Sequence, residues 1–171
     1  SVMGGPHPTF NKTVLEEKGI DAICTGEGDT AFDDFIGRLK NGEDYWLTKS
    51  FHVKYKGEIY KNGLAPLVDE LDDLPYPDRD LLYDADPSLA EVGLKSFVAG
   101  RGCPYKCSYC FNKQYNENYK GLGKIIRARS PEKMIREIED VLNRYPLNMV
   151  NMNDDVFMLK PNGWIKEFAK L

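Results

Sequence analysis

The chain has 171 residues, of which 42% are hydrophobic and 29% are charged, and its formal net charge is −4. No apolar run approaches the ~20 residues that a membrane-spanning helix needs. Four cysteines are too few for the disulfide framework of a small secreted protein, and the weak acidic balance gives no reason to expect nucleic acid as a partner. These properties indicate a soluble, cytoplasmic protein with enough apolar material for one core or two small ones.

The first half of the chain begins with two strand–turn–helix patterns. Val2-Met3 reads as the end of a strand, and Gly4 and Gly5 form the turn that follows it. The stretch 21–25 is a short buried strand, followed by a turn that contains Gly26 and Gly28. The helices after these turns have apolar positions at Phe10, Val14 and Leu15, and at Phe32, Phe35, Ile36 and Leu39. This order predicts a parallel α/β sheet, whose ligands bind at the carboxyl ends of the strands, where the glycine turns lie.

A β-hairpin and a linker are expected next. The stretch 51–60 alternates around Lys56-Gly57, which predicts the hairpin. The segment 71–79 holds two prolines and is the natural linker. Nine acidic residues lie between Leu67 and Glu91 against one arginine, whereas eight basic residues lie between Lys95 and Arg129 against one glutamate. The simpler interpretation is two solvated faces that attract each other; the alternative is a basic stretch that offsets a negatively charged cluster or ligand.

The second half shows a strand, a loop, a helix and another strand. The stretch 95–99 is the first strand, and Ser130 followed by Pro131 marks the start of a helix. The apolar face of this helix consists of Met134, Ile135, Ile138, Val141 and Leu142. The stretch 148–153 is the second strand, and it ends in an acidic turn. A βαβ unit is therefore expected, with candidate sites at the carboxyl ends of its strands.

Three cysteines in one short loop are the most informative feature of the chain. Cys103, Cys107 and Cys110 have the spacing Cys-x3-Cys-x2-Cys. Three thiolates can hold three irons of a cubane 4Fe-4S cluster and leave the fourth iron open to a substrate. A structural zinc site needs a fourth ligand, and Cys24 and both histidines lie far from the loop in sequence. The spacing alone therefore favours an open cluster and leaves the zinc site as the alternative.

The loop resembles the cluster loop of the radical S-adenosylmethionine (SAM) superfamily, with Gly102 before the first cysteine and Tyr109 in the aromatic position. The glycine turns and the Leu-Pro-x-Pro-x-Arg stretch ending at Arg79 resemble the class that also has a cobalamin-binding domain. The resemblance implies an α/β fragment: the C-terminal part of a Rossmann-like cobalamin-binding domain at 1–50, a hairpin and acidic linker at 51–93, and the first βαβ unit of a radical SAM partial (β/α) barrel at 94–171. The unusual ends of the chain suggest a piece of a longer protein.

The resemblance also implies roles for individual residues. The three cysteines would bind a 4Fe-4S cluster, SAM would chelate its open iron, and Tyr109 would pack against the adenine. Asp154 or Asp155 would hold the SAM amino group, although the family often has Gly-Gly-Glu there and a simple turn aspartate is the alternative. Arg127 and Arg129 could meet the SAM carboxylate, but a solvated surface is the preferred interpretation. Cobalamin, the third implied cofactor, would lie against Gly4, Gly5, Gly26 and Gly28.

The expected function is therefore that of an enzyme. A cobalamin-dependent radical SAM protein would cleave SAM to a 5′-deoxyadenosyl radical, most plausibly for methylation of a small-molecule substrate, with ring formation or rearrangement equally compatible. It would take electrons from a donor such as flavodoxin or ferredoxin. The alternatives are a radical SAM methylthiotransferase, which would need three further cysteines, and a non-catalytic iron–sulfur or zinc module.

Overall fold

The computed structural model describes residues 1–171, which divide into two compact units. The first unit contains Ser1–Val68 together with Lys113–Gly123, and the second contains Asp69–Asn112 together with Lys124–Leu171. The first unit thus extends past the boundary expected at residue 50 and includes a segment from the second half of the chain. The helices are too short or too polar for any of them to cross a lipid bilayer.

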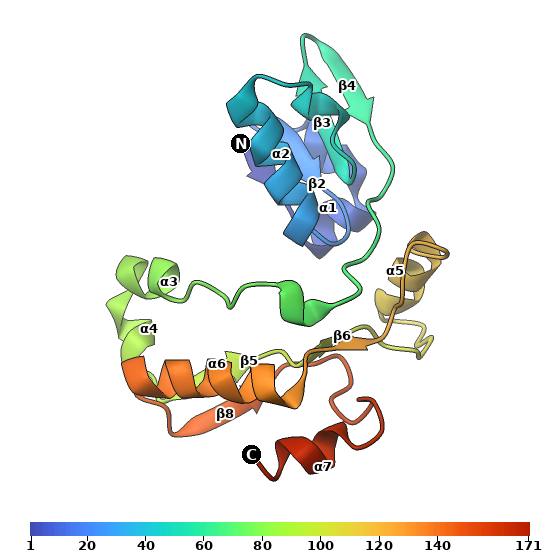
Figure 1. Ribbon diagram of the computed structural model, residues 1–171. Coiled ribbons are helices and arrows are strands. Elements are labelled where there is room, and N and C mark those ends of the chain that lie inside the picture. The colour runs from blue at the N-terminus through green and yellow to red at the C-terminus, as the bar shows by residue number, and fades with distance from the viewer. The chain divides into compact units, whose positions relative to one another are not determined.

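The first unit has a four-stranded mixed sheet in the order β1-β2-β3-β4 (Figure 1). Its strands are β1 (Val2–Met3), β2 (Ala22–Cys24), β3 (Phe51–Tyr55) and β4 (Glu58–Lys61). Strands β1 and β2 are parallel, as predicted, whereas β3 and β4 form the expected hairpin, which joins the sheet through antiparallel pairing of β3 with β2. Lys56 and Gly57 both have positive φ, which is the backbone conformation that a two-residue hairpin turn requires.

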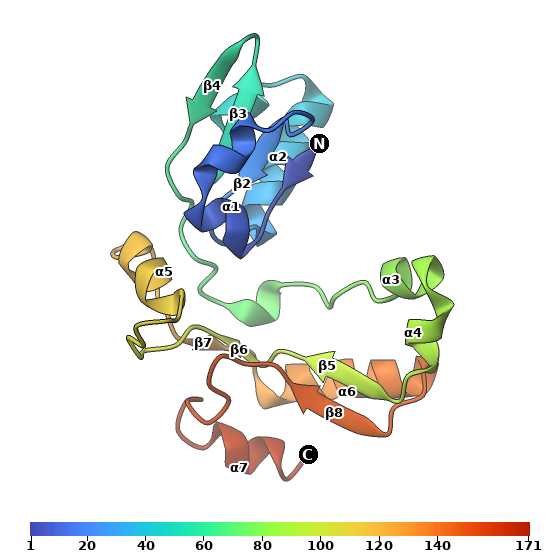
Figure 2. The same ribbon diagram turned by 180° about the vertical axis from the view of Figure 1, so that it is seen from behind.

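Helices cover both faces of this sheet (Figures 1 and 2). The helical segments are α1 (Pro6–Phe10), the 3-10 helices η1 (Lys12–Glu16) and η2 (Tyr45–Leu47), and α2 (Asp29–Asn41). Helix α2 packs Phe35 against Phe51 of β3, with ring centroids 4.2 Å apart. Phe32 is 46% exposed and Leu39 48%, so the expected apolar face of α2 is only partly buried. The first expected helix is instead two short turns that meet at Asn11.

The second unit contains the expected βαβ arrangement. Its elements are η3 (Leu71–Asp73), α3 (Asp80–Ala85), α4 (Pro87–Glu91), β5 (Leu94–Phe97), β6 (Gly100–Arg101), β7 (Arg127–Ala128), α6 (Pro131–Arg144), β8 (Met149–Met152) and α7 (Trp164–Phe168). Strands β5 and β8 are parallel, and α6 connects them. Helix α5 (Asn112–Asn118) follows the cysteine loop, and most of it belongs to the first unit.

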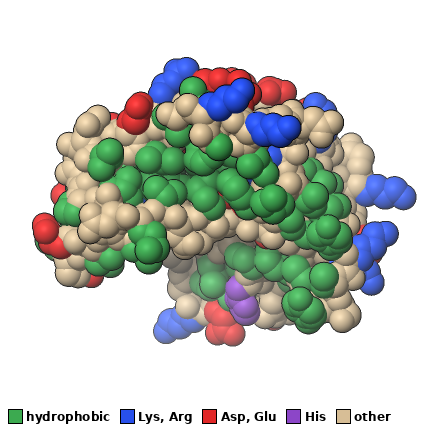
Figure 3. Space-filling model, turned by 90° about the horizontal axis from the view of Figure 1, so that it is seen from below, with side chains coloured by type: hydrophobic (Ala, Val, Ile, Leu, Met, Phe, Trp, Pro, Cys, Tyr) green, Lys and Arg blue, Asp and Glu red, His purple; other side chains and the backbone are tan.

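Helix α6 is defined by its cap and its buried face. The Ser130 side chain accepts a hydrogen bond from the amide of Lys133 at 3.1 Å, which satisfies a donor that the helix itself leaves open. Met134 and Val141 are fully buried with Phe97 of β5. Leu142, which was expected on the same face, is exposed. Apolar side chains also remain at the surface, and many gather on the face in Figure 3.

Candidate cofactor-binding site

The cysteine loop leaves the carboxyl-terminal side of β5 through the short strand β6. Strand β6 pairs antiparallel with β7, and two glycines make this close pairing possible. A Cβ atom on Gly102 would overlap the carbonyl oxygen of Ile125, and one on Gly100 would lie 2.7 Å from that of Arg127. The backbone of Gly102 also has φ +92°, a conformation that favours glycine. These contacts fix the point at which the loop begins, one residue before Cys103.

The three cysteines of the loop form no disulfide and differ in exposure. Cys103 is buried, Cys110 is half-buried and Cys107 is exposed. The amide of Cys110 donates a hydrogen bond to the carbonyl oxygen of Cys107 at 3.2 Å, which bends the end of the loop. No group of three His, Cys, Asp or Glu side chains in the structure is arranged to hold a metal ion. The donor set fits three irons of a cluster, whereas the arrangement of the thiols is not that of a preformed metal site. Tyr109 is 92% exposed, so it has no packing role in the core.

The acidic turn after β8 contains two aspartates with different surroundings. The Asp154 side chain is only 1% exposed; it pairs with the ammonium of Lys160 and accepts a hydrogen bond from the amide of Ala99 at 3.1 Å. Asp154 thus joins the ends of β5 and β8. Asp155 is exposed. Both aspartates line a small depression with Gly100, Arg101, Gly102 and Arg127 at the carboxyl ends of the strands.

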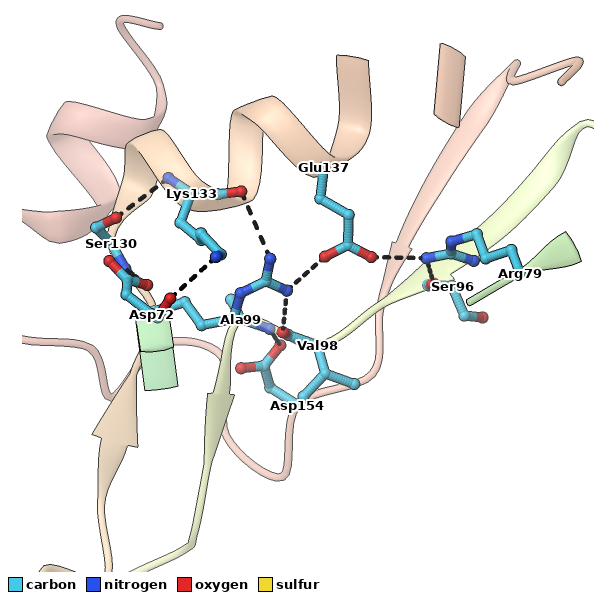
Figure 4. Close-up of polar contacts among 10 residues, drawn as sticks. Asp72, Arg79, Ser96, Val98, Ala99, Ser130, Lys133, Glu137 and Asp154 are labelled. Carbon is cyan, nitrogen blue, oxygen red and sulfur yellow. Dashed lines mark hydrogen bonds and ion pairs between the residues drawn. The ribbon is translucent and has the colours of Figure 1, made fainter. Parts of the chain in front are cut away.

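The structure corrects the preferred interpretation of Arg127 and Arg129 as members of a solvated surface. Arg127 is 7% exposed, and the Arg129 side chain is 12% exposed. Arg129 forms an ion pair with Glu137 of α6, which also binds Arg79 at 3.0 Å (Figure 4). Arg79 in turn donates to the carbonyl oxygen of Ser96 at 2.8 Å. Arg129 therefore holds α6 against the strand end, and Arg127 is the arginine that lines the depression.

Sequence reasoning missed Glu137, the centre of this network. Its side chain is only 3% exposed, although it lies on the apolar face of α6 between Met134 and Val141. A charged residue in the middle of an apolar stripe is the signal that could have identified it, because a buried carboxylate requires a partner. Arg79 ends the Leu-Pro-x-Pro-x-Arg linker, so the network also ties that linker to the βαβ unit.

The acidic linker makes polar contacts with the start and the end of helix α6, beyond the basic stretch Lys95–Arg129. Asp72 of the linker accepts a hydrogen bond from the amide of Ser130 at 2.9 Å, and its carbonyl oxygen accepts one from the Lys133 ammonium at 2.9 Å. Farther along the linker, Asp80 pairs with Arg144 at 2.8 Å. These contacts join the linker to α6, and the expected attraction between the two stretches stays a prediction.

In the first unit, the two glycine turns lie at the same edge of the sheet because β1 and β2 are parallel. Gly5 has φ +96° and Gly26 has φ +76°, so both turns use backbone conformations that favour glycine. A Cβ atom on Gly26 would overlap the hydroxyl of Tyr119. Gly26 is therefore required by packing within the chain. Gly4 and Gly28 lie against Cys24, at 3.8 Å and 3.5 Å from where a Cβ would stand.

Cys24 differs from the three loop cysteines. It is buried at the end of β2, and burial together with the charge of Asp29 raises its pKa to about 11. Its side chain belongs to the hydrophobic core of the first unit, together with Phe35, Phe51 and Val53. Cys24 is therefore a packing residue of the first unit.

Known proteins similar in sequence to this chain include methyltransferases, one of them a cobalamin-dependent radical SAM enzyme, and a cyclase. An uncharacterized methyltransferase of Pyrococcus horikoshii is 31% identical over 92% of this chain and 34% of its own length. The cobalamin-dependent radical SAM methyltransferase TokK of Streptomyces tokunonensis is 33% identical over 64% of this chain and 17% of its own. An anaerobic magnesium-protoporphyrin IX monomethyl ester cyclase of Cereibacter sphaeroides is 28% identical over 90% of this chain and 25% of its own length. The chain thus spans about a third or less of these curated relatives, and no protein-family model matches it.

The fold has a close counterpart among solved structures. The cobalamin-dependent SAM radical enzyme OxsB, with aqua-cobalamin and SAM bound, matches 99% of this chain and 23% of its own, with a TM-score of 0.74 and 22% identity. This likeness confirms the predicted fold class, a Rossmann-like sheet and part of a radical SAM domain. Together, the relatives and structural neighbours confirm the predicted resemblance to cobalamin-dependent radical SAM enzymes.

Proposed function

We propose that this chain forms the cluster-binding region and part of the cobalamin-binding region of a cobalamin-dependent radical SAM enzyme. The observation that carries the proposal is the loop of three cysteines, none in a disulfide, at the carboxyl-terminal side of a parallel βαβ unit. Its spacing suits three irons of a 4Fe-4S cluster, and the chain is related to proteins with this chemistry.

The chain's own residues have distinct tasks around the cluster. Cys103, Cys107 and Cys110 would hold it. The buried Cys103 would anchor the cluster to the unit, and the more exposed Cys107 and Cys110 would complete the ligand set. When bound and reduced, the cluster supplies the electron that cleaves SAM to a 5′-deoxyadenosyl radical. A flavodoxin or ferredoxin is the class of donor that would deliver this electron.

SAM would bind over the shallow depression at the strand ends. Asp155 is the carboxylate available for the SAM ammonium, because Asp154 already binds Lys160 and the Ala99 amide. Arg127 lines the same depression and suits the SAM carboxylate. Tyr109 projects from the cysteine loop and would cover the adenine. These assignments narrow the expected pair of aspartates to one.

Cobalamin would bind at the edge of the first unit where the glycine turns lie. Gly4 and Gly5 follow β1, and Gly28 is the N-cap residue of α2. Their lack of side chains lets a large ring approach the backbone at the carboxyl ends of parallel strands. Gly26 has a different task, since Tyr119 occupies the space beside it.

Methyl transfer is the reaction that we propose first, acting on a small-molecule substrate. Two of the relatives above are methyltransferases by name. Ring formation is the second candidate, because the Cereibacter sphaeroides cyclase matches nearly the same residues of this chain. Because this chain is similar both to methyltransferases and to a cyclase, we propose that it contributes to the steps that the two reactions have in common.

Anaerobic reconstitution of the full-length protein with iron and sulfide tests the proposal. We expect a 4Fe-4S signal in electron paramagnetic resonance that changes when SAM is added, because SAM binds the open iron. Replacing any loop cysteine by alanine should abolish cluster assembly, whereas the matched control Cys24→Ala should retain it. A signal that SAM leaves unchanged would indicate a closed cluster, and zinc in place of iron would indicate a structural module. Equal iron content in the parent and Cys107→Ala would also contradict the proposal.

A further inference from the structure

The segment that follows the cysteine loop is built into the first unit. Lys113–Gly123 belongs to that unit, although the residues on either side of it belong to the second. The amide of Leu67 donates to the carbonyl oxygen of Leu122 at 2.8 Å, and a Cβ on Gly123 would lie 3.1 Å from that of Leu67. The chain is therefore anchored in the first unit shortly after Cys110.

Tyr119 is the centre of this anchor. Its side chain is 1% exposed and is the largest fully buried side chain of the protein. The hydroxyl accepts a hydrogen bond from the amide of Glu27 at 2.7 Å and contacts Gly26 so closely that no side chain fits there. Burial raises the pKa of the Tyr119 phenol, so the hydroxyl stays neutral at physiological pH. A neutral buried hydroxyl is suited to a fixed hydrogen bond.

The glycine turn is held from further directions. A Glu27 side-chain oxygen accepts a hydrogen bond from the amide of Val68 at 2.9 Å, and the Thr9 hydroxyl accepts one from the amide of Gly26 at 2.9 Å. Three chain segments thus fix the turn: α1, the end of the first unit at Val68, and the segment after the cysteine loop. A turn held by these hydrogen bonds presents a single conformation to a ligand.

We propose that Tyr119 is a positioning residue that sets the glycine turn Gly26–Gly28 for cobalamin and couples cobalamin binding to the segment adjoining the cluster loop. The inference rests on the proposed function, because it takes cobalamin as the ligand of the turn. Its physical basis is that one hydroxyl joins the turn to residues that follow Cys110 in the chain. Cobalamin that packs on the turn stabilises the same conformation that Tyr119 holds, so each favours the other.

The test uses the full-length protein and its Tyr119→Phe variant, with Tyr60→Phe as a matched control. Tyr60 lies on β4 among aromatic rings and undergoes the same loss of a hydroxyl. Hydroxocobalamin is titrated by visible absorption. We expect affinity about three- to tenfold weaker in Tyr119→Phe, which corresponds to one lost hydrogen bond. Iron content should be unchanged, and Tyr60→Phe should bind like the parent.

Hydrogen exchange provides the readout that a merely structural role would not change. In the parent and in Tyr60→Phe, saturating cobalamin should slow amide exchange across residues 113–123. In Tyr119→Phe this cobalamin-dependent protection should disappear. Affinity and protection equal to those of the parent would overturn the inference while leaving the proposed function in place. A parent that takes up no cobalamin would overturn both, and that result is visible before any variant is made.

Discussion

The glycine turn of the first unit and the cysteine loop of the second are the two candidate ligand regions, and they differ in how the chain itself holds them. The turn is fixed by Tyr119, Glu27 and Thr9, and each makes a hydrogen bond between distant segments. In the loop, the backbone bond from Cys110 to Cys107 is local, and two of the three thiols reach solvent. On the proposed function, the turn would therefore be shaped before its ligand binds, whereas the loop would take its final shape together with the cluster.

The difference suits the two kinds of ligand. A large organic cofactor gains affinity from a rigid surface, because less conformational entropy is lost when it binds. A metal cluster forms several strong bonds to thiolates, and these bonds can order a loop as they form. The second unit compensates for its open loop with a rigid base, namely the network of Glu137, Arg79 and Arg129.

The largest effect is expected from removing Glu137, the centre of this network. We expect Glu137→Ala to destabilise the protein by about 3–5 kcal/mol, because two buried arginines would lose their partner. Thermal unfolding measures the effect. Glu139→Ala, an exposed glutamate on the same helix, is the matched control and should change little. Equal melting temperatures for the two variants would mean that the network does not support the second unit.

The sequence predicted features whose determinants are local. The cysteine spacing, the Ser130 cap and the Lys56-Gly57 turn each depend on residues within a few positions of one another. The contacts that distinguish the two regions are not local: the Tyr119 hydroxyl and the Glu27 amide are 92 positions apart, and Arg79 and Glu137 are 58 apart. Composition and periodicity contain no information about such pairs. The hairpin was predicted from its own residues. Its addition to the first sheet was not, because it depends on pairing between β2 and β3, which lie far apart in the sequence.

Asp154 and Asp155 show the same contrast within a single turn: Asp154 is held by contacts within the chain, whereas Asp155 is exposed. Asp154→Asn should lower the melting temperature, because the side chain loses its charge against Lys160 and changes its contact with Ala99. Asp155→Asn should leave stability unchanged and weaken SAM binding about ten- to a hundredfold, the loss of one charge-assisted hydrogen bond. SAM titration of the reconstituted protein and thermal unfolding together separate the two. If Asp155→Asn binds SAM like the parent, the ammonium is held elsewhere and the cysteine assignment still stands.

The smallest expected effect concerns the sheet of the first unit. His52 lies on β3 and is 5% exposed, and its pKa is lowered by burial first and then by the charges of Lys12 and Lys61. Above the ordinary histidine pKa of about 6.5, the folded and unfolded states are both neutral, so His52 adds no pH dependence. As the pH falls below that value, the unfolded chain binds a proton that the folded state resists, and stability decreases.

Melting temperatures measured between pH 7.5 and 5 should therefore fall by a few degrees more in the parent than in His52→Gln, which cannot titrate. His7→Gln, the same substitution at an exposed histidine outside the sheet, is the matched control. Parallel curves for the parent and His52→Gln would mean that the sheet admits a charged histidine. In that case the first unit is less rigid beneath its glycine turns than the contacts of Tyr119 imply, and the contrast between the two ligand regions would weaken.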